Sequence, residues 1–560
     1  MTWRYRLIFI VLVLFFTVVI GRLFYWQVAK AQELSALGQL QYGRTVTLYP
    51  QRGEIKTSDG FPIVSNKISY LVFANPKEIK DKNAVISLLS STLNLDTASV
   101  SASLSLDKFW VPITAGIDVQ TKDKVDKLNL PGIGFEQQYS RFYPEASLAA
   151  ELVGFVGKDE LGENKGYFGL EGYYNRLLRG KEGTAIQIHD AFGKPILARL
   201  SLESGQIDGS NLILSLNRPI QFLVERVLKE SIDKYGATSG MVGVMDPKTG
   251  EILAMAAYPN FDPRNYQDYP EALYRNSFIS DTYEPGSTFK PLVMSAALDA
   301  KLVTPQTKCP VCGGPVSVGG YLLHTWDDKY YKDTTMTEVI QHSDNTGMVF
   351  VAQKLGKDGM INYLDKFGIG SSTGIDLQGE VVPALKPESQ WYPVDLATTG
   401  FGQGISVTPI ELLSAVSAIA NNGKRMEPHV VSAIENPDGS VVKIPPRIID
   451  TPINGETAKV MTEIMINAVN KGEASWTKLD GYRVAGKTGT ASIPVNGHYD
   501  PTKTIASFVG FAPADDPKFS MIVILNKPTS SIYGAETAAP IFFEIAKNIL
   551  SLYGIAPSGQ

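Results

Sequence analysis

The stretch at residues 240–258, GMVGVMDPKTGEILAMAAY, decides the fold of this chain. Small and apolar residues fill 240–245 and, after Glu251, fill 252–258. The segment DPKTG between them contains the proline and glycine that favour a tight turn. Two apolar runs joined by such a turn predict a β-hairpin.

Three further strands are expected later in the chain. Residues 504–512 and 518–526 show a second hairpin pattern around an Asp-Asp-Pro turn, and 481–491 is predicted to be a separate strand. The long region 287–422 between the two halves is mainly helical in pattern, with Gly-rich connections. The sequence thus predicts a five-stranded, mostly antiparallel sheet beside a helical subdomain, which is an α+β fold.

Helices are expected to bracket this sheet in the sequence. Asn217 is a candidate N-cap with Pro219 in the first turn, and apolar residues then recur at helical spacing. A second amphipathic helix is expected at about 537–553. The sequence pattern changes near Asn211, so we place this domain at 211–560.

The first 27 residues are predicted to be a short tail and a single transmembrane anchor. An uncharged apolar run at 7–20 follows two arginines, and a helix over 3–26 is about 36 Å long, enough to cross a bilayer. A cleaved signal peptide is the alternative, because Ala29-Lys30-Ala31 has the form of a cleavage site. We favour the anchor, because this site lies well beyond the apolar run, past a charged residue and three bulky aromatics.

Residues 28–210 are interpreted as an elongated mixed β/α module that serves as a spacer or docking domain. They contain short β-like runs such as 44–49 and 70–73, a helical stretch near 84–93, and many Gly/Pro turns. No group of residues suited to acid–base chemistry is evident in this region.

The overall composition excludes some classes of function. The chain has 560 residues with 52 Lys and Arg against 57 Asp and Glu, a net charge of −5. No basic stripe or tail stands out, which argues against a nucleic-acid partner. Only five histidines occur, so acyl-transfer or hydrolytic chemistry is expected to use another base.

The two cysteines, Cys309 and Cys312, cannot form a disulfide framework. Their C-x-x-C spacing fits one local disulfide, a pair of thiols or half of a metal site. His324 is the nearest further ligand and a fourth is not obvious. We therefore predict no metal site and leave the state of the pair open.

The first candidate motif is EPGSTFKP at 284–291. A Pro-Gly turn precedes Ser287 and an apolar helical face follows it, which predicts Ser287 at a helix N-terminus with Lys290 one turn on. The helix dipole there favours a developing oxyanion. A lysine desolvated beside a serine can lose its proton and act as a base, so this pair needs no histidine.

The second candidate motif is Ser343-Asp344-Asn345. It lies in a predicted loop between helix-like segments at 335–341 and 346–355. A serine and an amide two residues apart can face one cleft. There the serine would relay a proton and the amide would hold a substrate.

The third candidate motif is VAGKTGTA at 484–491, on a strand predicted at a sheet edge. Lys487, Thr488 and Thr490 place a cation and two hydroxyls among small residues, with Gly489 between the threonines. A substrate backbone can pair with such a strand while its carboxylate meets these groups.

Two of these patterns have rival interpretations. Residues 481–488 match the phosphate-binding loop G-x-x-x-x-G-K-T, but no apolar strand precedes them and no helix follows. Residues 370–374 match the G-x-S-x-G elbow of α/β-hydrolases, but lie in a polar, Gly-rich loop without a preceding buried strand. Neither rival has the local structure that its chemistry needs.

The three motifs together form a more specific pattern. Ser287, Ser343 and Lys487 follow in this order, separated by 56 and 144 residues, and such a set is a signature of penicillin-binding proteins and class A β-lactamases. The chain resembles the class B penicillin-binding proteins over nearly its whole length, with a modest lean to the division-type subgroup. Further segments carry the resemblance: RGEI at 52–55, RFYP at 141–144, GLE at 169–171, GQG at 402–404 and FVGFAP at 508–513. One departure is TSDG at 57–60, where the family usually has an Asp-Arg pair before the glycine.

The resemblance implies a peptidoglycan D,D-transpeptidase without a cofactor. In such an enzyme Ser287 would attack the penultimate D-Ala carbonyl of a stem peptide and Lys290 would be the general base. Ser343 would carry the proton to the leaving amine, and Asn345 would hold the donor peptide.

The resemblance also implies substrate contacts around the third motif. Lys487, Thr488 and Thr490 would bind the carboxylate of the donor, with Gly489 beside them. Backbone N–H groups of Ser287 and Thr490 would form the oxyanion hole.

The partners that the resemblance implies are peptidoglycan stem peptides on lipid II-derived glycan strands, β-lactam antibiotics and a SEDS-family glycosyltransferase. The chain would be a single-pass protein of the cytoplasmic (inner) membrane, with its catalytic domain outside. Two rival functions remain: a β-lactamase-like hydrolase and a non-enzymatic sensor of β-lactams or wall peptides.

Overall fold

The computed structural model describes residues 2–160, 162–189, 195–495 and 498–557. The chain forms two compact units, each made of segments that are separate in sequence. The first unit comprises Met1–Arg52, Asn66–Ser140 and Arg179–Gly209, and the second comprises Gly53–Ser65, Arg141–Leu178 and Ser210–Gln560.

The first unit begins with the apolar helix that the sequence predicts. Helix α1 (Thr2–Phe24) continues into a π-helical turn (Tyr25–Ala29). Thr2–Ala29 has a mean hydropathy of 2.8 over its most apolar 18-residue stretch, and none of the residues in that stretch is buried. Among the described residues it is the one helix long and apolar enough to cross a bilayer.

The remainder of the first unit is a mixed β/α structure, as expected for this part of the chain. One sheet has the order β1-β8-β9, and a second group of strands pairs around β3. Helices α3, α4 and α5 pack with those strands around a small apolar core. The elements are α2 (Ala31–Tyr42), β1 (Gly43–Leu48), β3 (Pro62–Ala74), α3 (Lys82–Leu93), α4 (Thr97–Leu104), β4 (Val111–Ile117), α5 (Val119–Asp126), β5 (Ile133–Phe142), β8 (Gly183–His189) and β9 (Pro195–Ser204).

The centre of the second unit is the predicted five-stranded sheet. Its order is β12-β11-β21-β20-β19 and every pair is antiparallel, so β19 is an edge strand. The strands are β11 (Ser239–Met245), β12 (Ile252–Tyr258), β19 (Ala485–Val495), β20 (His498–Ala512) and β21 (Phe519–Asn526). Both predicted hairpins are therefore confirmed.

The strand predicted at 481–491 begins later than expected. Gly481 has a φ of +79°, and the N–H of Tyr482 donates to the carbonyl of Leu479, so this part of the chain turns before β19 starts. A left-handed glycine does not fit a strand, because extended backbone needs negative φ.

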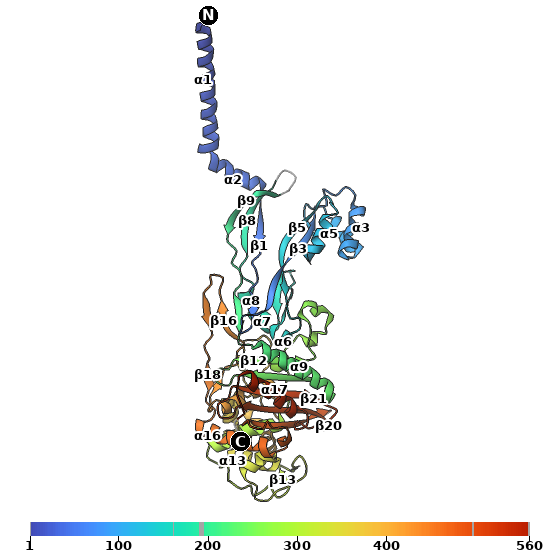
Figure 1. The fold of residues 1–560 in the computed structure, drawn as a ribbon, viewed down its shortest axis with the longest axis vertical. Coiled ribbons are helices and arrows are strands. Elements are labelled where there is room, and N and C mark those ends of the chain that lie inside the picture. The colour runs from blue at the N-terminus through green and yellow to red at the C-terminus, as the bar shows by residue number, and fades with distance from the viewer. Residues whose placement is uncertain (1, 161, 190–194, 496–497, 558–560) are drawn as a thin grey trace. The chain divides into compact units, whose positions relative to one another are not determined.

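Side-chain alternation along the strands fills two cores, one on each face of the sheet. In β21, Met521, Val523 and Leu525 belong to the core under helices α9 and α17. The intervening Ile522 and Ile524 belong to the core that contains helix α15. Figure 1 shows α9 (Arg218–Tyr235) and α17 (Ala538–Leu552) beside β20 and β21. The α9 N-cap is Asn217, as predicted, since its side chain accepts from Ile220 N.

The helical subdomain lies on the α15 side of the sheet. Helix α13 contacts α11, α12 and α14, and α16 contacts α11, α12, α15 and β19. The helices are α10 (Ser277–Ser280), α11 (Lys290–Asp299), α12 (Met336–Gln341), α13 (Asn345–Phe367), α14 (Pro393–Thr399), α15 (Pro409–Ala420) and α16 (Gly455–Lys471). This subdomain positions two of the three candidate motifs.

The remaining elements of the second unit are short. Arg141 and Glu171, from two of the segments that carry the family resemblance, form a buried ion pair of 2.6 Å. The elements are β2 (Ile55–Lys56), α6 (Ala150–Val153), β6 (Phe155–Lys158), β7 (Asn164–Tyr167), α7 (Gly169–Tyr173), α8 (Asn175–Leu178), β10 (Asn211–Leu214), β13 (Val316–Val318), β14 (Tyr321–Leu323), β15 (Arg425–Met426), β16 (Val431–Glu435), β17 (Val441–Lys443) and β18 (Ile448–Asp450).

Candidate active site

Ser287 lies in a 3₁₀ turn (Gly286–Phe289) that leads directly into α11. The α-helix itself begins at Lys290, so Ser287 lies one turn before the helix N-terminus rather than at it, where the sequence predicted it. Gly286 has a φ of +55°, and a Cβ there would come within 3.2 Å of the Ala491 side chain. The glycine therefore lets the serine turn pack closely against strand β19.

Lys290 is fully buried beneath the serine turn. Its Nζ donates hydrogen bonds to the backbone oxygen of Ser343 (2.5 Å), to Ser343 Oγ (3.3 Å) and to Asn345 Oδ1 (2.8 Å). Burial, followed by the charge of Lys487, lowers the pKa of Lys290 to about 7, against the opposite influence of Asp344 and Glu473. A substantial fraction of this lysine is thus neutral near neutral pH.

Ser343 links the lysine to Ser287. It lies between α12 and α13, as predicted, and has a φ of +56°. Its Oγ accepts from Lys290 and donates to Ser287 Oγ at 2.9 Å. No hydrogen bond joins Ser287 directly to Lys290 within the part of the chain that the structure describes, so the connected path runs through Ser343.

The other two residues of the second motif have different positions. Asp344 is buried and caps α13, where its Oδ1 accepts from the N–H groups of Thr346 and Gly347. Asn345 accepts from Lys290, and its Nδ2 donates to the carbonyl of His324 at 3.0 Å. The asparagine amide is thereby held in place in the wall of the cleft.

The third motif lies on the edge strand β19, as predicted. Lys487 is buried, and its Nζ donates to Thr488 Oγ1 at 2.8 Å. Thr488 Oγ1 in turn donates to Glu473 Oε2 at 2.7 Å. Burial lowers the pKa of Lys487, and the Glu473 carboxylate opposes this shift. Thr490 Oγ1 accepts from the N–H of Gly534 at 3.0 Å.

These motifs meet at one cleft of about 750 Å³. Ser287, Ser343, Asn345, Thr488 and Thr490 all line it, while Lys290 and Lys487 lie in the wall behind them. The cleft offers a nucleophilic hydroxyl, a lysine able to accept a proton and a cation-backed edge strand. Such a set of groups suits acyl transfer to and from a serine.

Sequence reasoning missed several residues that line the same cleft. Trp326 and Tyr533 come from distant loops, and their rings meet edge to face with centroids 5.6 Å apart. Glu473 and Glu536 add two carboxylates. None of these residues belongs to a short motif, and their approach depends on long-range packing, so no local signal marked them.

The rival interpretations of two motifs do not fit the structure. Lys487 and Thr488 lie inside strand β19, whereas a phosphate-binding loop needs a helix to open there. Residues 370–374 follow helix α13 rather than a buried strand, and Ser372 Oγ donates to Glu380. Neither segment has the architecture of the corresponding catalytic or phosphate site.

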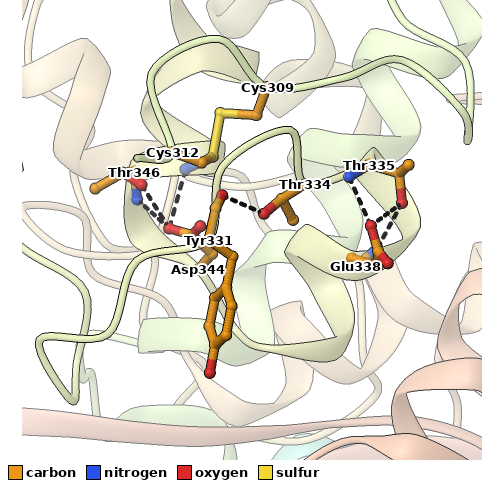
Figure 2. The surroundings of a disulfide bond; sticks show 9 residues. Cys309, Cys312, Tyr331, Thr334, Thr335, Glu338, Asp344 and Thr346 are labelled. Atoms are coloured by element: carbon orange, nitrogen blue, oxygen red, sulfur yellow. Dashed lines mark hydrogen bonds between the residues drawn. A yellow bond between two sulfur atoms is a disulfide. The ribbon is translucent and has the colours of Figure 1, made fainter. Parts of the chain in front are cut away.

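Cys309 and Cys312 form a disulfide in the loop before α12 (Figure 2). Cys309 N donates to the carbonyl of Thr334 (2.8 Å), and Tyr331 N donates to that of Cys312 (3.0 Å). The Tyr331 ring stacks on His342 with centroids 4.8 Å apart. Of the alternatives that the sequence left open, the disulfide is the one present. The disulfide constrains residues 309–312, which hydrogen-bond to residues 331 and 334 in the segment before the Ser343 loop.

Two family models match the chain. One is described as the penicillin binding protein transpeptidase domain and matches residues 240–549. The other is described as the penicillin-binding protein dimerisation domain and matches residues 47–214. The first range contains all three motifs.

Curated proteins of known name are similar over almost the full length. The chain is 35% identical to stage V sporulation protein D of Bacillus subtilis, an alignment that covers 99% of this chain and 87% of that protein. It is 29% identical to peptidoglycan D,D-transpeptidase FtsI of Escherichia coli K12, with 99% and 93% covered.

Solved structures of similar fold include proteins of the same kind. A peptidoglycan synthetase from Bifidobacterium adolescentis matches with a TM-score of 0.74 and 28% identity, over 92% of this chain and 98% of that one. Penicillin binding protein 3 from Mycobacterium tuberculosis, complexed with aztreonam, matches with a TM-score of 0.71 and 26% identity over the same shares.

Proposed function

The chain belongs to the class B penicillin-binding proteins, and on that premise we propose that it cross-links peptidoglycan stem peptides through an acyl-enzyme on Ser287. One observation carries the assignment of the nucleophile: the hydrogen-bonded path from Lys290 through Ser343 to Ser287 at the cleft. The lowered pKa of Lys290, about 7, supports its role as the base.

In the acylation step, Ser287 Oγ attacks the carbonyl carbon of the penultimate D-Ala, and its proton moves toward Lys290. Ser343 then passes a proton to the nitrogen of the terminal D-Ala as the C–N bond breaks, and free D-Ala leaves. Backbone N–H groups of Ser287 and Thr490 stabilise the oxyanion in this proposal. The position of Ser343, between Lys290 and Ser287, suits this exchange.

In the second step, the amine of another stem peptide attacks the ester carbon. The amine loses a proton to the lysine–serine path, a new peptide bond forms, and Ser287 regains its hydroxyl proton. A base with a pKa near neutrality can serve both steps, because it accepts and returns a proton at little cost.

Donor recognition falls to Asn345 and the third motif. The carboxylate of the donor is bound by Lys487, Thr488 and Thr490, a charge-assisted interaction. Gly489 is needed for the close packing of this strand, because a Cβ there would lie 2.4 Å from Ser507 Oγ and 2.8 Å from Thr288 Cγ2.

A labelled penicillin tests this function, because opening its lactam ring by Ser287 leaves a stable ester. Peptide mapping should find the label on Ser287, and S287A should lose both the adduct and cross-linking while its melting temperature stays the same. Rapid release of hydrolysed penicillin without a lasting adduct would instead assign a β-lactamase. Binding without any covalent adduct would assign a sensor.

The membrane placement and partners form the remaining part of the proposal. Residues 1–27 anchor the chain in the cytoplasmic membrane, 28–210 form a pedestal, and 211–560 form the transpeptidase domain outside. A SEDS-family glycosyltransferase that supplies lipid II-derived strands is the expected partner. The exposed apolar surface of Thr2–Ala29 supports the anchor.

Protease added to cells without their wall tests this topology. It should digest residues 28–560 and leave an N-terminal tag intact. Loss of the tag while the membrane of these cells is unbroken would contradict the topology. Co-purification with the SEDS glycosyltransferase of the same genome, lost when 1–27 are removed, tests the partner.

A further inference from the structure

Glu473 is a carboxylate in the cleft that none of the three motifs contains. It follows α16 and is held by close backbone packing at Gly472, where a Cβ would lie 2.3 Å from Ala468 O and 2.8 Å from Gln341 O. Asn467 Nδ2 also donates to Gln341 Oε1 at 2.8 Å. The backbone of this loop is thus fixed against the end of α12, and the Glu473 side chain is directed at Thr488.

Two hydrogen bonds at the Thr488 hydroxyl run in series, one received from Lys487 and one donated to Glu473. Lys487 Nζ donates to Thr488 Oγ1, and Thr488 Oγ1 donates to Glu473 Oε2. A hydroxyl has one proton to donate. While Glu473 accepts that proton, Thr488 cannot donate to a carboxylate that enters from the cleft, and the entering carboxylate also meets the charge of Glu473.

We propose that Glu473 is a specificity-determining residue that acts as an internal stand-in for the donor carboxylate in the empty cleft. The entering carboxylate displaces it from Thr488 and takes over the hydroxyl proton. This inference rests on the proposed function, because it assumes that Lys487, Thr488 and Thr490 recognise the donor carboxylate. Glu473 thereby sets how strongly the cleft selects for anionic donors.

A second cavity offers space for the displaced side chain. It has a volume of about 190 Å³, and Glu473 lies in the wall of both this cavity and the catalytic cleft. Lys329, Lys471 and His342 also line it, so cationic side chains and an imidazole border the space. Asp327 and Asp344 line it too and reduce this positive charge. Because Glu473 borders both spaces, rotation of its side chain from the cleft into this cavity is the movement that the inference requires.

Benzylpenicillin and its methyl ester test the inference, because they share the lactam and differ in one negative charge. The measured quantity is the ratio of their second-order acylation rates, acid over ester. In E473Q this ratio should rise about fivefold, chiefly because the uncharged amide is a weaker acceptor than the carboxylate and releases the Thr488 proton to the acid more readily. Loss of the Glu473 charge also alters the pKa of Lys290, but this alters the acylation rates of both compounds alike and leaves their ratio unchanged.

Each other outcome overturns the inference. A fall in the ratio would mean that Glu473 mainly keeps Lys487 charged, and an unchanged ratio would mean that it only packs. E536Q is the matched control. It removes a carboxylate from the same cleft, but among the described residues Glu536 has no hydrogen bond to Thr488. Its ratio should change less than that of E473Q.

Two further measurements keep the two levels of proposal separate. In a Thr488→Val background, E473Q should lose most of its effect on the ratio, because the contested hydroxyl is gone; a full effect there would contradict the inference. The adduct is mapped in every variant. Label away from Ser287 would refute the proposed function, whereas label on Ser287 with an unaltered ratio would refute only the role of Glu473.

Discussion

Two buried lysines lie in the wall of this cleft, in regions of different architecture. Lys290 begins helix α11 in the helical subdomain, and Lys487 lies on the edge strand β19. Both are almost completely buried, and within the described residues neither has a carboxylate within ion-pair distance. Burial is the first cause that lowers the pKa of each. The residue type and the burial are the same, so the neighbours must separate their roles.

The neighbours differ in where the hydrogen bonds lead. Lys290 donates to Ser343 and Asn345, a path that ends on the nucleophile Ser287. Lys487 donates to Thr488, a path that ends on the carboxylate of Glu473. Charge on Lys487 further lowers the pKa of Lys290, so the pair favours one neutral and one charged lysine. The comparison teaches that a second cation can help to keep a lysine neutral, and so able to accept a proton, near neutral pH.

The largest expected effect comes from replacing the base while keeping its charge. K290R retains a cation but cannot lose its proton, so acylation by benzylpenicillin should fall about 1000-fold or more. The matched variant K487R keeps the charge that its own position needs and should fall less than about tenfold. Acylation rates measured by stopped flow decide this. Equal losses of acylation rate in K290R and K487R would contradict the proposed difference between the two lysines.

The next largest effect concerns the cation on β19. K487M removes the charge behind the carboxylate site, so acylation by benzylpenicillin should fall about 100-fold, a loss typical of a buried charge-assisted contact. The methyl ester should fall only a few-fold, because it carries no carboxylate. Parallel loss for both compounds would mean that Lys487 serves the acyl step itself.

A pH profile gives a smaller but more diagnostic effect. The base form of Lys290 is neutral, so acylation by the methyl ester should rise with pH to a plateau, with a midpoint at about 7. Below the midpoint it should fall about tenfold for each pH unit. In K487M the midpoint should move to higher pH, since the second cause of the lowered pKa is lost. An unmoved midpoint would show that the two lysines are not coupled.

The sequence could predict the members of the site better than their connections. Ser287, Lys290 and Ser343 follow local rules of spacing and turn chemistry, and two hairpin patterns around proline-containing turns predicted strands β11, β12, β20 and β21. A proton relay by Ser343 was expected, but its hydrogen bonds to Lys290 and Ser287 could not be predicted, because they depend on a 56-residue separation closed by tertiary packing.

Other features could not be predicted from the sequence for related physical reasons. Gly53–Ser65 belongs to the second unit although the flanking residues belong to the first. Its place there depends on pairing between β2 and β10, strands far apart in the sequence, which no local pattern encodes. Glu473 follows a helix end in a sequence that predicts only a loop, and its contact with Thr488 joins two elements by side chains alone. The 3₁₀ turn at Ser287 reflects close packing on β19 rather than helix propensity.

The smallest expected effect concerns the disulfide, which lies on the Lys290 side of the comparison. Its ring closes over a sequence separation of three, so breaking it in C309S/C312S should lower the free energy of unfolding by about 2 kcal/mol at most. The loop also supports Tyr331, which stacks on His342 next to Ser343. Acylation by benzylpenicillin and by its methyl ester should therefore fall together, by about threefold or less, as the Ser343 loop loosens.

Denaturant unfolding and the two acylation rates measure these effects in one preparation. The acid-to-ester ratio is the sharp readout, because it depends on the Lys487 side and should not move when only the Ser343 loop is disturbed. A changed ratio with an unchanged ester rate would mean that the disulfide supports the carboxylate site instead. Since Glu473 and His342 line the same small cavity, such a result would show that the two lysine regions are mechanically joined through that cavity.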